Sequence, residues 1–484
     1  MKISQSYELT IKTLKQSFDS DDVTFMETGG ENFNALLIFI NSLVDKKALG
    51  DLVIKPLTEL KEKPDKKELS TLFLSPENKE VYDTDEIIKE ITNGNSVLIV
   101  EDLPVAFSFA LVKFEKRAIA EPPTSNVIKG PREGFVENLN DNVSMMRRRL
   151  KTDKLKIETF EIGSFSKTQV ALLYVKGVCD LRLIKKIRNK LNKIDIDAVL
   201  DSSYVSKFLG EHKTSIFKQI GNTEKPDILT SKIMEGRVAI LVDGSPIALT
   251  VPYLLIEDFQ SPSDYYTSNY TATLSRVIRI FAVVVSLLLP ALFISAELFH
   301  LQLIPLSFLL TIVNSIKGIP LSPSYEMFFT LLIFEILNEA SVRMPRYVGM
   351  VVSIVGGLVL GETAVNAGII SAPVLMIIAF SGICLYTVPE LVHTFSLIRI
   401  IFLVVGGSLG AYGLILFSVG IVVYLVSFEN YGTPLTAPYS PLIQEDLKDG
   451  FYKGFVLGKE NRPLSIKRAK IQDVKGDLNE TTKD

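Results

Sequence analysis

The hydrophobic pattern divides the chain into two parts. Residues 1 to about 258 alternate short apolar runs with charged, amphipathic stretches. Between Arg276 and Phe428, long apolar stretches contain six Lys or Arg, six Glu and no Asp, whereas the other 331 residues carry the remaining 95 charges. This pattern predicts a water-soluble region followed by a membrane region.

The first part of the soluble region, residues 1–118, predicts a small α/β unit. Phe33–Val44 is apolar enough for a buried helix, and Ser96–Val100 is typical of a buried strand. A stretch rich in Pro, Ser, Thr and Asn over residues 120–130 has the composition of a linker. We therefore expect a first cytosolic lobe over 1–118 and a second over 119–258.

The second lobe begins with a helical pattern near Arg132–Leu150. Two alternating strands are expected at Lys156–Ile162 and Gln169–Val175, followed by a charged helix at Leu181–Asn192. Strands separated by helices favour layered α/β packing.

An internal repeat connects the two lobes. Residues 91–106 align without gaps on residues 233–248, at an offset of 142. Both copies have the pattern of a helix end, a glycine cap, a buried strand, an acidic turn with proline and a second strand. Chance similarity between two strand-turn-strand units is the alternative to a repeated architecture. The fold class expected is an α/β soluble N-terminal region of two lobes, followed by an α-helical multi-span membrane domain.

The membrane domain is expected over 276–428, with a polar, cytosolic tail over 429–484. A span needs about 20 mostly apolar residues. Six stretches are candidates: Ile280–Phe299, Leu301–Ile316, Tyr325–Ala340, Tyr347–Gly361, Ile369–Thr387 and Ile400–Phe428. The last, 29 residues without charge, is the strongest span, and Leu301–Ile316 is short enough to be re-entrant. Four to six crossings fit the pattern.

Charges interrupt the third candidate span. Glu335 and Glu339 lie within it and Arg343 follows it, and each charge costs about 2.5–3.5 kcal/mol at the bilayer centre. Glu339 and Arg343 are four residues apart, a spacing that allows an ion pair. The alternative is an amphipathic helix lying in the membrane interface.

Small and polar residues follow in the next stretch. The small side chains allow helices to approach closely in lipid, and the two polar ones lie four residues apart on one helix face. We expect this set to line an ion pathway or pack an oligomer: Gly349, Ser353, Gly356, Gly357, Gly361, Glu362 and Asn366. The alternative is a dry helix interface in which Glu362 reaches the headgroups.

The composition argues against several classes of function. The three histidines have neither metal-ligand nor catalytic spacing, so we expect no enzyme activity, metal or cofactor. Two cysteines, one in each half, give no disulfide framework, and a net charge of −3 gives no footprint for nucleic acid. The basic triplet Arg147–Arg149 predicts a solvated helix face. The N-terminus lacks a secretory signal, which favours a cytosolic location for the first half.

Ordered motifs across residues 115–450 resemble the A subunits of GerA-family spore germinant receptors. They include Arg117–Thr124, Lys129–Glu137, Asn222–Asp227, Gly236–Gly244, Gln260–Tyr266, Leu287–Leu292, Phe334–Leu337 and Val352–Gly357. Lys218 and Glu362 depart from the family, which usually has proline and glutamine there.

The resemblance implies a subunit of a receptor in the inner membrane of the spore. Its implied partners are a transporter-like B subunit, which holds the nutrient, and a lipoprotein C subunit. The A subunit is expected to form a homo-oligomer with an ion-conducting path. A SpoVAF-type accessory subunit without conduction and a membrane-anchored enzyme are the alternatives.

Overall fold

The computed structural model describes residues 7–30, 32–60, 62–73, 78–112, 130–345, 348, 361–454 and 463–466. The chain forms two compact units. The first comprises Met1–Tyr253, Asn430–Thr433 and Gly458–Asp484, and the second comprises Leu254–Glu429 and Pro434–Leu457. The finer division of the sequence into four domains stays a prediction.

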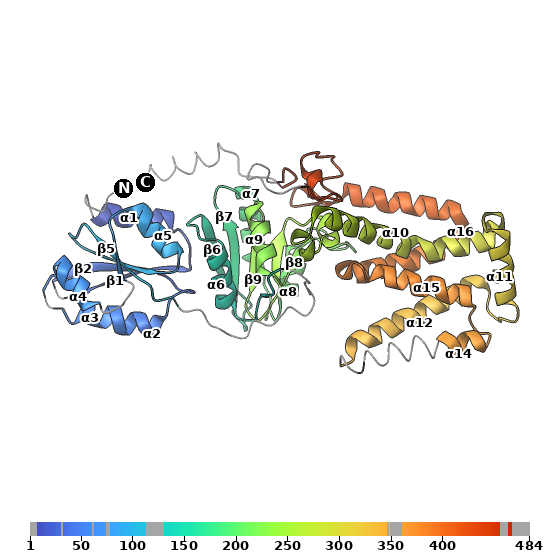
Figure 1. The fold of residues 1–484 in the computed structure, drawn as a ribbon, viewed down its shortest axis with the longest axis horizontal. Coiled ribbons are helices and arrows are strands. Elements are labelled where there is room, and N and C mark those ends of the chain that lie inside the picture. Colours follow the sequence, from blue (N-terminus) through green and yellow to red (C-terminus); the bar gives the residue numbers. More distant parts are fainter. Residues whose placement is uncertain are drawn as a thin grey trace. The chain divides into compact units, whose positions relative to one another are not determined.

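The first lobe of the first unit is a five-stranded antiparallel sheet between two helical layers (Figure 1). The strand order is β1-β2-β4-β5-β3. The strands are β1 Val23–Gly30, β2 Phe33–Ile40, β3 Asn78–Val81, β4 Ser96–Val100 and β5 Ala106–Phe109. Helices α1 Tyr7–Ser17 and α5 Thr84–Thr92 pack on one face, and α2 Lys46–Leu49, η2 Gly50–Ile54, α3 Lys55–Thr58 and α4 Lys66–Leu72 on the other.

The second lobe has the same topology, with strand order β6-β7-β9-β10-β8. The strands are β6 Leu155–Ile162, β7 Thr168–Val175, β8 Gly221–Thr223, β9 Val238–Val242 and β10 Ala248–Val251. Helices α6 Leu139–Arg149 and α9 Pro226–Met234 cover one face, and α7 Leu181–Leu191 and α8 Ser202–Leu209 the other.

The sequence repeat is a structural repeat. Leu98 pairs with Phe107 in the β4–β5 hairpin, and Ile240 pairs with Leu249 in β9–β10, at the offset of 142. Gly94 and Gly236 precede the two hairpins with φ of 98° and 106°, a conformation that glycine adopts without steric cost. The predicted repeated architecture is therefore confirmed, and so are the strands expected at Ser96–Val100, Lys156–Ile162 and Gln169–Val175.

The helix predicted over Phe33–Val44 is wrong, because Phe33–Ile40 forms strand β2. β2 lies inside the sheet between β1 and β4, with helices on both faces. Its side chains are apolar on both faces, so the two-residue period of a strand disappears from the sequence. A continuous apolar run of this kind does not distinguish a buried strand from a buried helix.

The helix predicted over Arg132–Leu150 begins later, at Leu139. The side chain of Asn138 accepts hydrogen bonds from the backbone N–H groups of Asn140 and Asp141, which caps the helix.

The basic triplet at the end of α6 does not form a solvated face. Arg147 is only 2% exposed, and its guanidinium donates two hydrogen bonds of 2.7 Å to Asp22 of the first lobe. It also donates to Ser20 Oγ at 3.0 Å. Arg148 and Arg149 pair with Glu133. The prediction was wrong because Asp22 lies more than a hundred residues earlier in the chain, in the other lobe.

We expect Arg147→Ala to destabilise the sheet unit by about 3 kcal/mol, because it leaves the Asp22 carboxylate buried without its counter-ion. Arg148→Ala is the matched control, with an expected loss below about 1 kcal/mol for a partly exposed pair. Urea unfolding of the purified full chain, followed by tyrosine fluorescence because the sequence has no tryptophan, measures both. Equal losses in the two variants would contradict this role for Arg147.

The second unit is helical (Figure 1). Its main helices are α10 Asn269–Phe299, α11 Leu306–Ile316, α12 Pro323–Arg343, α14 Gly361–Asn366, α15 Ala372–Leu385 and α16 Val392–Ser427. Short elements are η3 Leu255–Phe259, η4 Pro262–Tyr265, η5 Leu301–Leu303, η7 Pro389–Leu391, β11 Glu429–Asn430, β12 Thr433–Pro434 and η8 Asp446–Lys448. Helix α10 packs against α12, α15 and α16 around a shared apolar core.

Within the described residues, two helical stretches are long and apolar enough to cross a membrane, Asn269–Phe299 and Pro389–Ser427. The second is bent at Gly410, whose φ of 64° and ψ of −155° are not helical. Phe402 and Phe417 stack edge to face with centroids 4.8 Å apart, although 15 residues of straight helix would separate them by about 22 Å. Ile400–Phe428, the strongest span expected from the sequence, lies almost entirely within the second stretch. Gly410 divides that stretch into two helical arms, which the sequence pattern does not show.

Glycines allow α16 to approach α10. A Cβ on Gly406 would lie 2.7 Å from the carbonyl oxygen of Ala291, and one on Gly410 would lie 2.9 Å from the Phe299 ring. Close backbone contact through glycine is a common way for helices to pack in lipid.

Candidate functional site in the helical unit

An ion pair lies among the apolar helices. Arg399 of α16 is 1% exposed, and its guanidinium donates to the carboxylate of Glu335 on α12. Ser396, one turn earlier on α16, donates to the same carboxylate oxygen at 2.5 Å. The Arg399 guanidinium also lies 6.0 Å from the centre of the Phe334 ring. The pair therefore joins α12 to α16 through charge.

The network continues through serine hydroxyls to two further helices. Arg399 Nη1 donates to Ser381 Oγ of α15 at 2.9 Å. Ser381 Oγ donates in turn to the backbone carbonyl of Ser286 on α10 at 3.0 Å. Because Ser286 and Ser381 are fully buried, these bonds are shielded from water. Four helices thus meet at one connected polar network.

Sequence analysis identified Glu335 as an intramembrane charge but missed its partner. A lone arginine inside an apolar helix is itself a signal, because such a charge is retained when it faces a counter-ion. The sequence separation of 64 residues hid the pairing.

The ion pair that the sequence predicts between Glu339 and Arg343 is confirmed in geometry. Arg343 Nε donates to Glu339 Oε1 at 2.7 Å, with side chains 77% and 55% exposed respectively. These two residues lie at the surface of α12, unlike the buried Arg399 and the partly buried Glu335.

A second buried carboxylate links α12 to α15. Glu326 is fully buried, and its Oε1 accepts the backbone N–H of Ser371 at 2.6 Å. Its Oε2 has no hydrogen-bond partner within the described part of the chain. The bond to Ser371 caps α15, which begins at the next residue.

The predicted pore residues are only partly described. Gly349, Ser353, Gly356 and Gly357 lie outside the described residues. Gly361 is buried, and a Cβ there would lie 3.2 Å from the Leu375 side chain. Glu362 and Asn366 are both exposed on α14. Their role in a pathway stays a prediction.

A separate charge cluster holds the start of α10. Asp264 accepts hydrogen bonds from Arg279 at 2.7 and 2.9 Å, from Arg276 Nε at 3.2 Å and from the Ser261 N–H at 3.0 Å. Arg276 Nη1 also donates to the side chain and carbonyl of Asp449, both at 3.0 Å. The two arginines that flank the first predicted span are therefore engaged with partners inside the unit.

Burial, the largest single effect, raises the pKa of Asp264, but the hydrogen bond from Arg279 and the other donors outweigh it, so the pKa lies below its usual range. Because the pKa is lower in the folded chain, the ionised carboxyl stabilises the fold when the pH is above the pKa of the unfolded carboxyl, about 3.9. This contribution is lost as the pH falls through the folded pKa.

We expect Asp264→Asn to lower the unfolding temperature at pH 6 and to have a smaller effect near pH 3, because the contribution of the wild-type charge falls below the pKa of the unfolded carboxyl, about 3.9. Thermal unfolding of the detergent-solubilised chain at the two pH values measures this difference. An effect of equal size at both pH values would show that the charge of Asp264 is not the cause.

We expect Glu335→Gln to destabilise the helical unit by about 3–5 kcal/mol, because it leaves Arg399 charged and buried without a counter-ion. Glu339→Gln is the control, since an exposed pair four residues apart contributes about 0.5 kcal/mol. Unfolding by SDS in mixed micelles compares the two variants. A Glu335→Gln chain as stable as the control would mean that Arg399 finds another partner.

Comparison with known proteins assigns the chain to a family. The family model described as Bacillus/Clostridium GerA spore germination protein matches residues 10–465. Spore germination protein KA of Bacillus subtilis (strain 168) is 34% identical over 467 residues, covering 94% of this chain and 86% of that protein. The uncharacterized membrane protein YfkQ of the same organism is 32% identical over 470 residues, covering 96% and 91%.

Among solved structures, the N-terminal domain of the A subunit of the Bacillus megaterium spore germinant receptor GerK3 aligns with 53% of this chain and 98% of that chain. The sequence identity is 25% and the TM-score is 0.42. The match of the family model over most of the chain, together with the relative at 34% identity, is decisive. The chain belongs to the GerA family of Bacillus and Clostridium spore germination proteins.

Proposed function

We propose that this chain is the A subunit of a nutrient germinant receptor in the inner membrane of the spore. Family membership over residues 10–465 supports this role, as do relatives named as spore germination proteins. By the same likeness, its partners are a transporter-like B subunit and a lipoprotein C subunit, and its sheet lobes lie in the cytosol.

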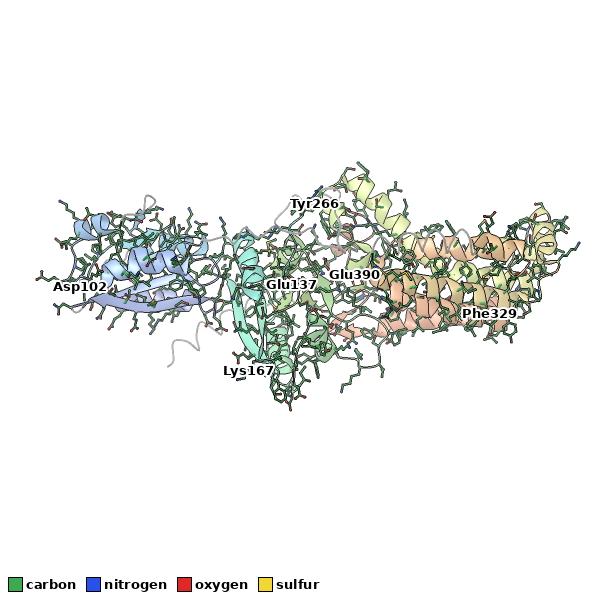
Figure 2. The ribbon with its side chains drawn as sticks, turned by 90° about the horizontal axis from the view of Figure 1, so that it is seen from below. Asp102, Glu137, Lys167, Tyr266, Phe329 and Glu390 are labelled. Atoms are coloured by element: carbon green, nitrogen blue, oxygen red, sulfur yellow. The ribbon has the colours of Figure 1, made fainter. Side chains whose placement is uncertain are left out.

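The buried network around Arg399 is the observation that carries the membrane role. Helices α10 and α16, which it joins, are apolar and leave large hydrophobic side chains exposed. Phe329 of α12 likewise lies on the outer surface of the helical unit (Figure 2). Apolar residues outside and paired charges inside are typical of a bundle surrounded by lipid. The bend at Gly410 supports a multi-pass arrangement, because it divides α16 into two arms.

The ion path belongs to the same proposal. In an oligomer, several copies of Glu362 and Asn366 around an axis would be hydrated together, which one chain alone does not achieve. Their exposure on α14 supports a position open to water or to neighbouring copies. Gly349, Ser353, Gly356 and Gly357 would form the narrow part of the path, and the path would open when the helices tilt.

A SpoVAF-like accessory subunit without nutrient-gated conduction is the second candidate. The uncharacterized membrane protein YfkQ matches 96% of this chain, so similarity at this level does not by itself identify a nutrient receptor. Genes for a transporter-like protein and a lipoprotein beside that of this chain would favour the receptor.

The receptor proposal predicts that Glu362→Gln and Gly357→Leu each reduce nutrient-triggered cation release several-fold, because one removes charge from the path and the other fills its narrow part. Release is measured from spores in which each variant is the only copy of the gene. Glu339→Gln is the control outside the path. Unchanged release in both variants, with normal receptor assembly, would remove this segment from the pathway.

A further inference from the structure

The two sheet lobes share a topology but carry opposite charge. Residues 1–112 contain 12 Lys, no Arg and 20 Asp or Glu, a net charge of −8. Residues 130–253 contain 21 Lys or Arg and 15 Asp or Glu, a net charge of +6. Since one strand order serves both lobes, the fold does not require this difference. We therefore relate the difference in net charge to what surrounds each lobe.

The basic lobe is the one connected to the helical unit. The chain passes from the second lobe into the helical unit at Tyr253–Leu254. It returns at Asn430–Thr433, which belong to the sheet unit although α16 ends only at Ser427. The acidic lobe, over residues 1–112, is followed in the chain by the basic lobe and not by the helical unit.

Helix α7 concentrates the positive charge of the second lobe. Residues 181–193 contain six Lys or Arg and no acidic residue. One side of the helix packs into the lobe through Leu183, Ile184, Ile187 and Leu191. On the other side Arg182 and Lys185 are exposed, as is Lys193 just after the helix end. We include Lys193 in the exposed basic face of α7.

The remaining basic residues of this helix are engaged within the lobe. Lys186 pairs with Glu211, and Arg188 pairs with Glu158 at 2.6 Å. Lys190 donates to the carbonyl of Leu209 at 2.6 Å. The exposed face formed by Arg182, Lys185 and Lys193 is therefore distinct from the basic residues that stabilise the lobe.

Tyr431 ties this helix to the segment that follows α16. The Nζ atoms of Lys186 and Lys190 lie 5.0 and 4.8 Å from the centre of its ring. Its hydroxyl donates to the carbonyl of Leu209 at 2.6 Å, and its N–H donates to Glu211 at 2.7 Å. Tyr431 lies only four positions after Ser427, the last residue of α16, so at most about 14 Å of chain joins them.

We propose that the exposed basic face of α7 binds the headgroups of anionic lipids in the membrane that surrounds the helical unit. The inference rests on the membrane location in the proposed function. At most about 14 Å of chain joins Tyr431, which contacts α7, to the last residue of α16. Each Lys or Arg near an anionic surface contributes about 1 kcal/mol of attraction. The neighbouring α8 leaves Tyr204 and Phe208 exposed, and a tyrosine is often found at the membrane interface.

The test uses the full chain reconstituted into vesicles of phosphatidylcholine, with or without a quarter of phosphatidylglycerol. A fluorophore is attached at Asn189→Cys, an exposed position on α7, and the two native cysteines are buried. Energy transfer to acceptors on the lipid headgroups reports the distance of α7 from the membrane surface. The charge variant is Arg182→Glu, Lys185→Glu and Lys193→Glu together. The control reverses three exposed lysines of the acidic lobe, Lys12→Glu, Lys46→Glu and Lys89→Glu, with the same change in net charge.

We expect energy transfer to rise at least about threefold when phosphatidylglycerol is present, to fall again in high salt, and to lose this rise in the α7 variant but not in the control. Energy transfer that does not change when phosphatidylglycerol is added, or that falls equally in both variants, would overturn the inference. An acidic protein surface as the true ligand would give the first of these results. Flotation with both kinds of vesicle tests the membrane location separately, because a chain that floats with neither would contradict the proposed function itself.

Discussion

The helical unit depends on the burial of one arginine. A charged guanidinium among apolar side chains is costly unless a counter-ion and hydrogen-bond acceptors surround it. Two nitrogens of the Arg399 guanidinium meet this requirement, one through Glu335 on α12 and one through Ser381 on α15, while its Nε has no acceptor among the described residues. Ser381 donates in turn to α10. Satisfying one charge therefore fixes the relative arrangement of four helices, which apolar packing in lipid alone specifies poorly.

A buried arginine also contributes to the contact between the two lobes of the sheet unit. Arg147 of the second lobe reaches Asp22 of the first, and Lys156 donates to the carbonyl of Ser17 at 2.7 Å. Burial lowers the pKa of Lys156 to about 8. The two lobes differ in net charge but have the same strand order and hairpin register. The difference between them therefore lies in their surfaces and not in their topology.

Local patterns in the sequence were sufficient to predict many of the strands and helices of the sheet unit. The strand at Ser96–Val100 and the helix at Leu181–Asn192 follow from apolar periodicity, and the repeat from the matching glycines and turns. Sequence reasoning failed where distant contacts decide the outcome. Phe33–Val44 is apolar because helices cover both faces of β2, and Ile400–Phe428 is interrupted because Gly410 adopts a positive φ beside Phe299. The Arg399–Glu335 pair likewise joins residues that no local pattern connects.

Attraction between Glu335 and Arg399 holds α12 against α16 in the helical unit. The most direct measurement is nutrient-triggered germination of spores that carry Glu335→Arg, Arg399→Glu or both, as the only copy of the gene. The account predicts that each single change abolishes the response, because it places like charges together, and that the double change restores a substantial part of it. Normal germination in both single variants would contradict the claim. So would a double variant that is no better than the single ones at equal protein level.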